Sequence, residues 1–234
     1  MPLLEKERDV EPIKNGDRMT RDEFIRRAEG VPRLKLAELI GGRVYIMSPV
    51  SLAHSKLDGI IQVCLGLYAY QTPGCEYGPN STCFMGEDEA PQPDSHLRIS
   101  EECGGTSRAG EHGYLEGPPE LIAEVSKSSS KHDLIDKFKI YETEGVQEYL
   151  VIIEQKNEIR WHRLNKGEYE LVHLADDGVH RSAVFPGLWI DVRAFAERNP
   201  QKVMATLNAG INSPAHAKFV RHLAAKIRAL KRGR

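Results

Sequence analysis

The chain has 234 residues, of which 40% are hydrophobic and 28% charged, and its formal net charge is -2. This composition is not that of a collagen-like, disulfide-stapled or disordered protein, and it suits one domain with an appended segment. Because the charge is close to zero, nucleic acid would have to be bound through a local basic surface or a metal. The longest apolar runs are too short to span a bilayer and the N-terminus has no secretory signal, so we expect a cytoplasmic protein without membrane contact.

The N-terminal part of the chain predicts a helix, a hairpin and a longer helix. Capping-box spacing at Thr20 indicates a short helix. The glycine pair at residues 41–42 predicts a turn between two strands within residues 35–49. Apolar residues then recur with helical spacing from residue 51 to residue 71. Pro73 and the glycine after it end that pattern.

The rest of the chain is rich in strands until its last forty residues or so, which are helical. The segment after the first strands is Gly-rich and has no phosphate-loop pattern, so we expect a plain loop there. The predicted elements are two or three strands in 75–99, a loop at 100–119, a strand at 120–126, a helix at 131–144, an antiparallel meander at 146–154, 158–165 and 168–175, an edge strand within 185–195, and helices at 194–209 and 216–232. This order predicts an α/β or α+β fold with one sheet flanked by helices.

Glu124 is a carboxylate within an otherwise apolar predicted strand. By the period of two, it shares a strand face with Ile122 and Ser126, away from its most apolar neighbours. An unpaired buried charge is costly, so a cation should lie near it. Asp94, near the start of another β-rich run, could hold Mg²⁺ together with Glu124, because Mg²⁺ prefers oxygen ligands. Lys137, on the following helix, could stabilise charge in a transition state.

The order and spacing of these motifs resemble the "putative restriction endonuclease" family, formerly a domain of unknown function, in the PD-(D/E)XK nuclease superfamily. The similarity runs over residues 19–195. It includes AELIGGRVYIMSP, the helix that opens with His54, QPD, AEVS, HDLIDKFKIYETEGVQEYLVI and FPGLWIDV. The resemblance implies a restriction-endonuclease-like fold, a central mixed β-sheet flanked by helices. It also implies Mg²⁺-dependent hydrolysis of phosphodiester bonds, with DNA as the expected substrate and Mn²⁺ as a substitute metal.

The resemblance also assigns roles to individual residues. Asp94 and Glu124 would be catalytic metal ligands, the carbonyl of Val125 a backbone ligand, and Lys137 the catalytic lysine of the superfamily. Glu38, in AELIGG, matches a recurrent family acid that would complete the site.

One position departs from the wider superfamily. The usual lysine two residues after the glutamate is replaced by Ser126, and Lys127 follows it. We prefer Lys137 because the family carries a lysine on this helix.

Residues 1–18 are polar and mixed in charge, so we expect a loose N-terminal tail there. The resemblance covers a nuclease-like domain at 19–195, and a basic helical extension follows at 196–234. The last predicted helix has an apolar stripe and no acid among its residues. It is either a solvated helix docked on the body or on a partner, or a surface that binds DNA backbone through Lys218, Arg221 and Arg228.

Each candidate residue also has a structural interpretation. Glu124 could be a half-exposed strand acid paired with a lysine, and Asp94 a turn residue after Pro93. Lys137 could form an exposed ion pair with Asp133, four residues before it. Glu38 could be structural, and the His at position 54 fits a helix start or a core position better than a general base.

Two further alternatives concern the cysteines and the function as a whole. Cys103 with His112 and two upstream cysteines could be drawn as a metal site, but free cysteines are commonly small buried residues. The second function hypothesis is a nuclease-fold module that binds nucleic acid or a partner without cutting. By analogy of fold, a homodimer is also plausible.

Overall fold

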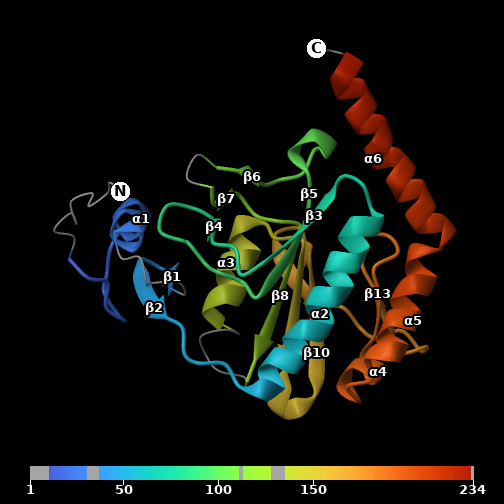
Figure 1. The fold of residues 1–234 in the computed structure, drawn as a ribbon, viewed down its shortest axis with the longest axis horizontal. Coiled ribbons are helices and arrows are strands. Elements are labelled where there is room, and N and C mark those ends of the chain that lie inside the picture. Colours follow the sequence, from blue (N-terminus) through green and yellow to red (C-terminus); the bar gives the residue numbers. More distant parts are fainter. Residues whose placement is uncertain (1–10, 31–36, 111–112, 128–134, 233–234) are drawn as a thin grey trace, which may run out of the picture.

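The structure is a computed structural model that describes residues 11–30, 37–110, 113–127 and 135–232 (Figure 1). Its helices are α1 (Arg21–Glu29), α2 (Leu52–Gln71), α3 (Lys137–Glu144), α4 (Val192–Ala196), α5 (Pro200–Ile211) and α6 (Pro214–Arg232). Its strands are β1 (Ala37–Ile40), β2 (Arg43–Ile46), β3 (Cys75–Pro79), β4 (Cys83–Phe84), β5 (Ser95–Ile99), β6 (Arg108–Ala109), β7 (Leu115–Glu116), β8 (Leu121–Ser126), β9 (Glu148–Ile153), β10 (Glu158–Asn165), β11 (Glu168–Leu171), β12 (Val179–Arg181) and β13 (Trp189–Asp191).

The centre of the molecule is a six-stranded sheet in the order β11-β10-β9-β8-β5-β3. β8 and β9 are parallel and the other neighbours are antiparallel, so the sheet is mixed, as predicted. Helix α2 covers one face and α3 the other (Figure 1). The predicted alternation along β8 is confirmed, because Leu121 packs in the core that contains α2 whereas Ile122 packs with Tyr141 of α3.

Several local predictions are confirmed by the hydrogen bonds that begin or end the elements. Oγ1 of Thr20 accepts from the backbone N–H of Glu23 at 3.4 Å and caps α1. Oγ of Ser51 caps α2 in the same way, at 3.1 Å from the N–H of His54. The meander of β9, β10 and β11 is antiparallel, as expected. These elements follow from local chemistry, and this is why the sequence predicts them.

The described part of the predicted loose tail is instead packed on the β1–β2 hairpin. Ile13 is 7% exposed, and the N–H of Gly16 donates to the carbonyl of Val44 at 2.8 Å. Oδ1 of Asn15 accepts from the N–H of Ile46 at 2.9 Å. The prediction was wrong for residues 11–18 because the hairpin offers backbone groups that need partners, and these residues supply them.

Four other expectations differ from the structure in their details. The segment 100–119, expected to be a loop, contains the short strands β6 and β7, which form a small sheet with β4. The segment within 185–195 forms β13, which pairs with β12 in a separate two-stranded sheet and not at the edge of the main one. The helix expected at 194–209 is divided into α4 and α5, because Pro200 cannot continue a helix and Asn199 caps a new one through the N–H of Lys202 at 3.1 Å. The start of the helix expected at 131–144 lies outside the described residues, and α3 itself begins at Lys137.

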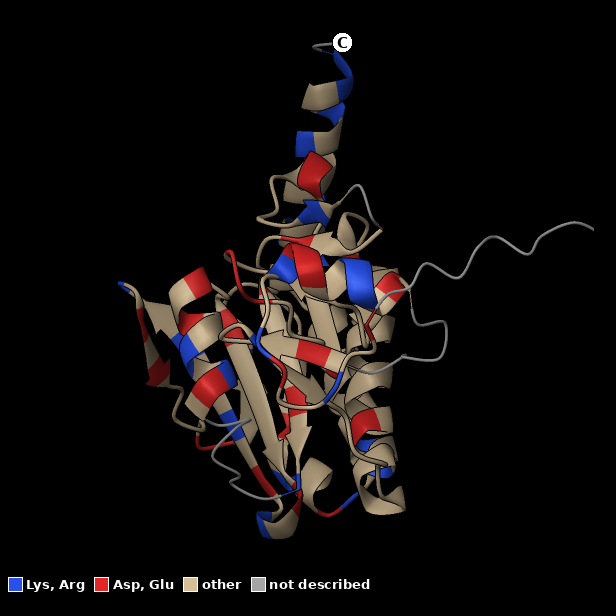
Figure 2. Ribbon diagram, turned by 90° about the vertical axis from the view of Figure 1, so that its left-hand side faces the viewer, with Lys and Arg blue, Asp and Glu red and all other residues tan. Residues whose placement is uncertain are grey.

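The C-terminal helices pack on the sheet domain. Val203 and Leu207 of α5 and Leu223 of α6 are buried in the same core as β8. The expected apolar stripe of α6 docks only in part, because Leu230 stays 40% exposed and the helix runs beyond the rest of the molecule (Figures 1 and 2). Across the described residues, no helix combines the length and the apolar character needed to cross a membrane.

Candidate active site

Two carboxylates meet where β5 and β8 lie side by side. The antiparallel register pairs Ser95 with Ala123, and this places Asp94, just before β5, opposite Glu124. Oδ2 of Asp94 accepts from the backbone N–H of Val125 at 2.7 Å. Asp94 therefore continues the strand pairing through its side chain, and this holds it beside Glu124. A turn residue that faced solvent would not be held in this way.

Lys137 reaches both the Glu124 carboxylate and a third acid from the first position of α3. Its Nζ donates to Oε1 of Glu124 at 2.9 Å and to Oε1 of Glu38 at 2.7 Å. The Lys137 side chain is 1% exposed. Glu124 is thus paired with a lysine, as its structural alternative held, but it is buried and not half-exposed. Asp133, the alternative partner of Lys137, lies outside the described residues, and an exposed pair is wrong because Lys137 is buried.

Tyr141 and Gln92, which are not among the residues predicted for the site, complete the contacts around these groups. Tyr141 lies one helical turn after Lys137, and its hydroxyl donates to Oε1 of Glu124 at 2.9 Å. The N–H of Gln92 donates to Oε1 of Glu38 at 2.7 Å. The spacing of four residues from Lys137 could have indicated Tyr141. Gln92 acts through its backbone N–H, so its residue type does not indicate this role.

Burial dominates the electrostatics of the site. It raises the pKa of Asp94, and it raises the pKa of Glu124 to about 8 despite the attraction of Lys137. Burial alone would lower the pKa of Lys137, but the adjacent Glu124 and Glu38 carboxylates raise it above its usual value. Lys137 is therefore charged. When Asp94 and Glu124 are both ionised, their carboxylates repel each other. A further cation between Asp94 and Glu124 would relieve that repulsion.

These side chains open into a cavity of about 490 Å³. His54, at the start of α2, lies in its wall with Nε2 3.8 Å from Oδ2 of Asp94. Lys127 also lines this cavity but is exposed at its edge, whereas Lys137 lies at its base against the acids. The structure thus brings together Asp94, Glu124, Lys137 and Glu38, and it keeps Lys127 apart from their contacts.

The chemistry of this donor set suits a hard cation. Lys137 and Tyr141 both donate to Oε1 of Glu124, and within the described ranges no donor contacts Oε2. The N–H and C=O of one strand residue point to the same side, so we expect the Val125 carbonyl to face Asp94. The described residues contain no cluster of three or more acids, His or Cys arranged to hold a metal. A cation here would need water and phosphate oxygens to complete its shell, which is how Mg²⁺ is usually bound.

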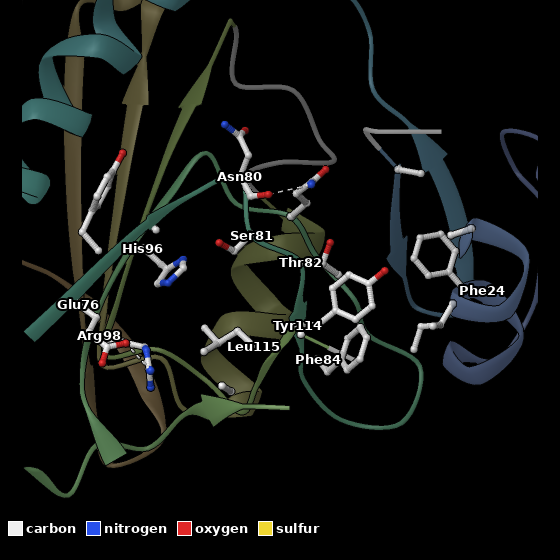
Figure 3. Close-up of a pocket in the computed structure, with 18 residues that line it drawn as sticks. Phe24, Glu76, Asn80, Ser81, Thr82, Phe84, His96, Arg98, Tyr114 and Leu115 are labelled. Atoms are coloured by element: carbon white, nitrogen blue, oxygen red, sulfur yellow. Dashed lines mark hydrogen bonds and ion pairs between the residues drawn. The ribbon is translucent and has the colours of Figure 1, made fainter. Parts of the chain in front are cut away.

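A second cavity of about 460 Å³ is lined by residues of α1, β3, β4 and β5, among others (Figure 3). Its walls hold the His96 ring and the aromatic rings of Phe84 and Tyr114, whose centroids lie 4.9 Å apart with an angle of 47° between the ring planes. Its charged lining residues are Arg98 and Glu76, which pair with each other. Among the described residues it has no pair of acids like that of the first cavity, so we place the candidate active site in the first.

The four cysteines are free, buried residues, as their structural interpretation predicts. Cys64, Cys75, Cys83 and Cys103 are all free and buried, and burial raises the pKa of Cys64 to about 12. His112, the remaining member of the alternative metal site, lies outside the described residues.

Comparison with known proteins identifies the family. The fold matches the crystal structure of a "putative nuclease belonging to DUF820" from Anabaena variabilis, with a TM-score of 0.56, 16% identity, and coverage of 81% of this chain and 99% of that one. No curated protein matches the chain. The model of the Uma2 family, described as "Putative restriction endonuclease", matches residues 21–193. The chain therefore belongs to the Uma2 family.

Proposed function

We propose that the protein is a Mg²⁺-dependent endonuclease that hydrolyses phosphodiester bonds in DNA. The observation that carries this proposal is the buried contact of Lys137 with Glu124, next to Asp94, in an open cavity. Family membership supports a nuclease. Metal, substrate and residue roles rest on the donor set described above.

Asp94, Glu124 and the Val125 carbonyl would hold the metal, with Glu38 as a further candidate ligand. When bound, Mg²⁺ would act as a Lewis acid toward the phosphodiester and lower the pKa of its water. Lys137 carries a positive charge at the base of the cavity, where it can orient a water and stabilise negative charge that develops on the phosphate. Glu38 and Tyr141 fix the positions of Lys137 and the Glu124 carboxylate.

The basic residues of α6 are the proposed auxiliary contacts to phosphates. Lys218, Arg221 and Arg228 are all exposed. However, α6 packs at the C-terminal end of α2, where His216 Nε2 lies 2.9 Å from Thr72 Oγ1. The active-site cavity lies at the other end, and the 20 residues of α2 separate the two by about 30 Å. Only a long nucleic acid could reach both.

The test is a cleavage assay with supercoiled plasmid and labelled oligonucleotides, in EDTA, Mg²⁺ and Mn²⁺. We expect cleavage with either metal and none in EDTA. Asp94→Asn and Glu124→Gln should abolish cleavage and keep the fold, as judged by circular dichroism. Metal-independent cleavage, or full activity of both variants, would refute the proposal. Binding without cleavage by the wild type would support the silent module instead.

A further inference from the structure

The connection between β2 and α2 forms an apolar lip on the active-site cavity. Six consecutive residues line the cavity here, from Ile46, the last residue of β2, to Ser51, and four of them are apolar: Ile46, Met47, Pro49 and Val50. Ile46 is 39% exposed and Val50 65%, and Leu52, the first residue of α2, is 73% exposed. None of them belongs to the core clusters of the described residues. A run of exposed apolar residues on a connecting segment calls for a partner, because such segments are normally polar.

The charges of the same cavity are a poor match for two phosphate backbones. The described lining residues include four acids and two lysines: Glu38, Asp94, Glu124, Glu154, Lys127 and Lys137. Lys137 is already paired with two of those acids, so Lys127 is the one lysine of the described lining that remains for a phosphate. Binding of a duplex depends mainly on lysine and arginine contacts to phosphates on both strands. In the described lining of the cavity, Lys127 alone is available for such a contact.

We propose that the lip contacts nucleobases of an unpaired strand, so that the preferred substrate is single-stranded nucleic acid or an unpaired region of a duplex. This inference rests on the proposed function. Val50 and Ile46 line the same cavity as Asp94 and Glu124, so they are within reach of a strand whose phosphate lies at the two acids. Every base has an apolar face, which is accessible when the strand is unpaired and buried by stacking in a duplex. A duplex would first have to unstack, at a cost of about a few kcal/mol per step.

The chain supplies a matched control for the lip. Val63 lies on α2, is 56% exposed and does not line the cavity. The Val50→Ser and Val63→Ser changes therefore remove the same side chain from positions of similar exposure. Val50→Tyr tests the opposite direction, because an aromatic ring stacks better on a base than an aliphatic side chain does.

Cleavage and binding should be measured with one labelled strand of about 12 nucleotides, a length near the site sizes of single-strand binders, free or annealed to its complement. The wild type should prefer the free strand. Val50→Ser should raise KM for it about fivefold, given the usual size of base contacts, with little change in kcat, whereas Val63→Ser should match the wild type. Val50→Tyr should lower KM. The salt dependence should not change, because no phosphate contact is altered.

Binding by the Asp94→Asn variant separates this inference from the proposed function. Suppose that the wild type cleaves no substrate, but that adding Val50→Ser to the Asp94→Asn protein weakens its binding of the free strand. The lip is then supported, and the nuclease proposal fails. Equal or better cleavage of the duplex, or equal effects of Val50→Ser and Val63→Ser, would overturn the inference. A wild-type dimer that dissociates on Val50→Ser would also overturn it, since the lip would then cover a second copy of the chain.

Discussion

Lys137 donates to Oε1 of Glu38 at 2.7 Å, with both side chains almost wholly buried, at 1% and 3% exposure. The same oxygen accepts from the N–H of Gln92, two residues before Asp94. Glu38 therefore connects the lysine to the segment that carries a proposed metal ligand. This arrangement gives Glu38 a positioning role that does not depend on direct contact with a metal.

The first prediction follows from that pairing. Glu38→Ala should destabilise the protein by about 3 kcal/mol, because the buried Lys137 loses one of its two carboxylate partners and the N–H of Gln92 loses its acceptor. Glu38→Gln keeps an acceptor for Lys137 and Gln92 and should cost less. Urea unfolding of both variants, without metal, measures the difference. A Glu38→Ala protein as stable as the wild type would show that Lys137 is not held as the structure places it.

The two lysines of the cavity give the second prediction. Lys137→Ala should reduce the cleavage rate by more than about tenfold, a typical loss for one transition-state contact, while metal affinity stays near that of the wild type. Lys127→Ala should do much less, since Lys127 is exposed at the edge of the cavity. Because Lys137→Ala leaves two buried acids without their partner, Lys137→Arg serves as the variant that keeps the charge. The opposite order of effects would assign catalysis to Lys127.

The third prediction concerns pH. The pKa of Glu124 is raised from 4.5 to about 8, so between these values the folded protein keeps a proton that the unfolded chain has released. The free energy of unfolding should therefore fall as pH rises through this range, by at most about 1.4 kcal/mol per pH unit for this one group. Glu124→Gln cannot titrate there, so its stability relative to the wild type should increase with pH. Urea unfolding in EDTA at several pH values measures this.

A comparison with metal present is the control for that experiment. A cation at Asp94 and Glu124 favours the ionised carboxylates, so Mg²⁺ should weaken the decline of wild-type stability with pH and leave Glu124→Gln nearly unaffected. If the free energy of unfolding changes with pH in the same way for the wild type and for Glu124→Gln in EDTA, then Glu124 does not carry the proton.

The fold was predictable because its main signals are local. The period of two in β8, the cap at Ser51 and the turn glycines at residues 41–42 each act over a few residues. The burial of Lys137 against Glu38 could not be derived in this way. It needs the β1–β2 hairpin to lie beside the start of α3, and this contact joins segments far apart in the chain.

The packed tail and the division between α4 and α5 were missed for different reasons. Residues 11–18 have polar character, but they satisfy backbone groups of the hairpin, as in the hydrogen bond between Gly16 and Val44. Pro200 was visible in the sequence, and its breaking effect should have outweighed the helical pattern around it. In the site, the choice of Lys137 over Lys127 came from the family resemblance, because spacing alone favours neither.

The last prediction concerns α6, where Lys218 and Arg221 lie between the buried His216 and Leu223 and Arg228 lies beyond them, all three exposed. The triple change Lys218→Ser, Arg221→Ser and Arg228→Ser removes three charges and keeps the buried Leu223, so the helix should remain docked. The distance of about 30 Å along α2 corresponds to about nine base pairs of a duplex at 3.4 Å each, and an extended single strand covers it with fewer nucleotides.

A labelled strand of about three nucleotides should therefore bind the wild type and the triple variant equally, because even when extended it cannot span from the cavity to α6. A strand of about thirty nucleotides should bind the variant more weakly. The slope of log affinity against log salt should be shallower by about 0.7 for each single-strand phosphate contact that is lost. The affinity should fall about equally for unrelated sequences, because phosphates carry no sequence information. Equal slopes for both proteins on the long strand would rule out phosphate contacts by α6 and would leave protein–protein docking as its role.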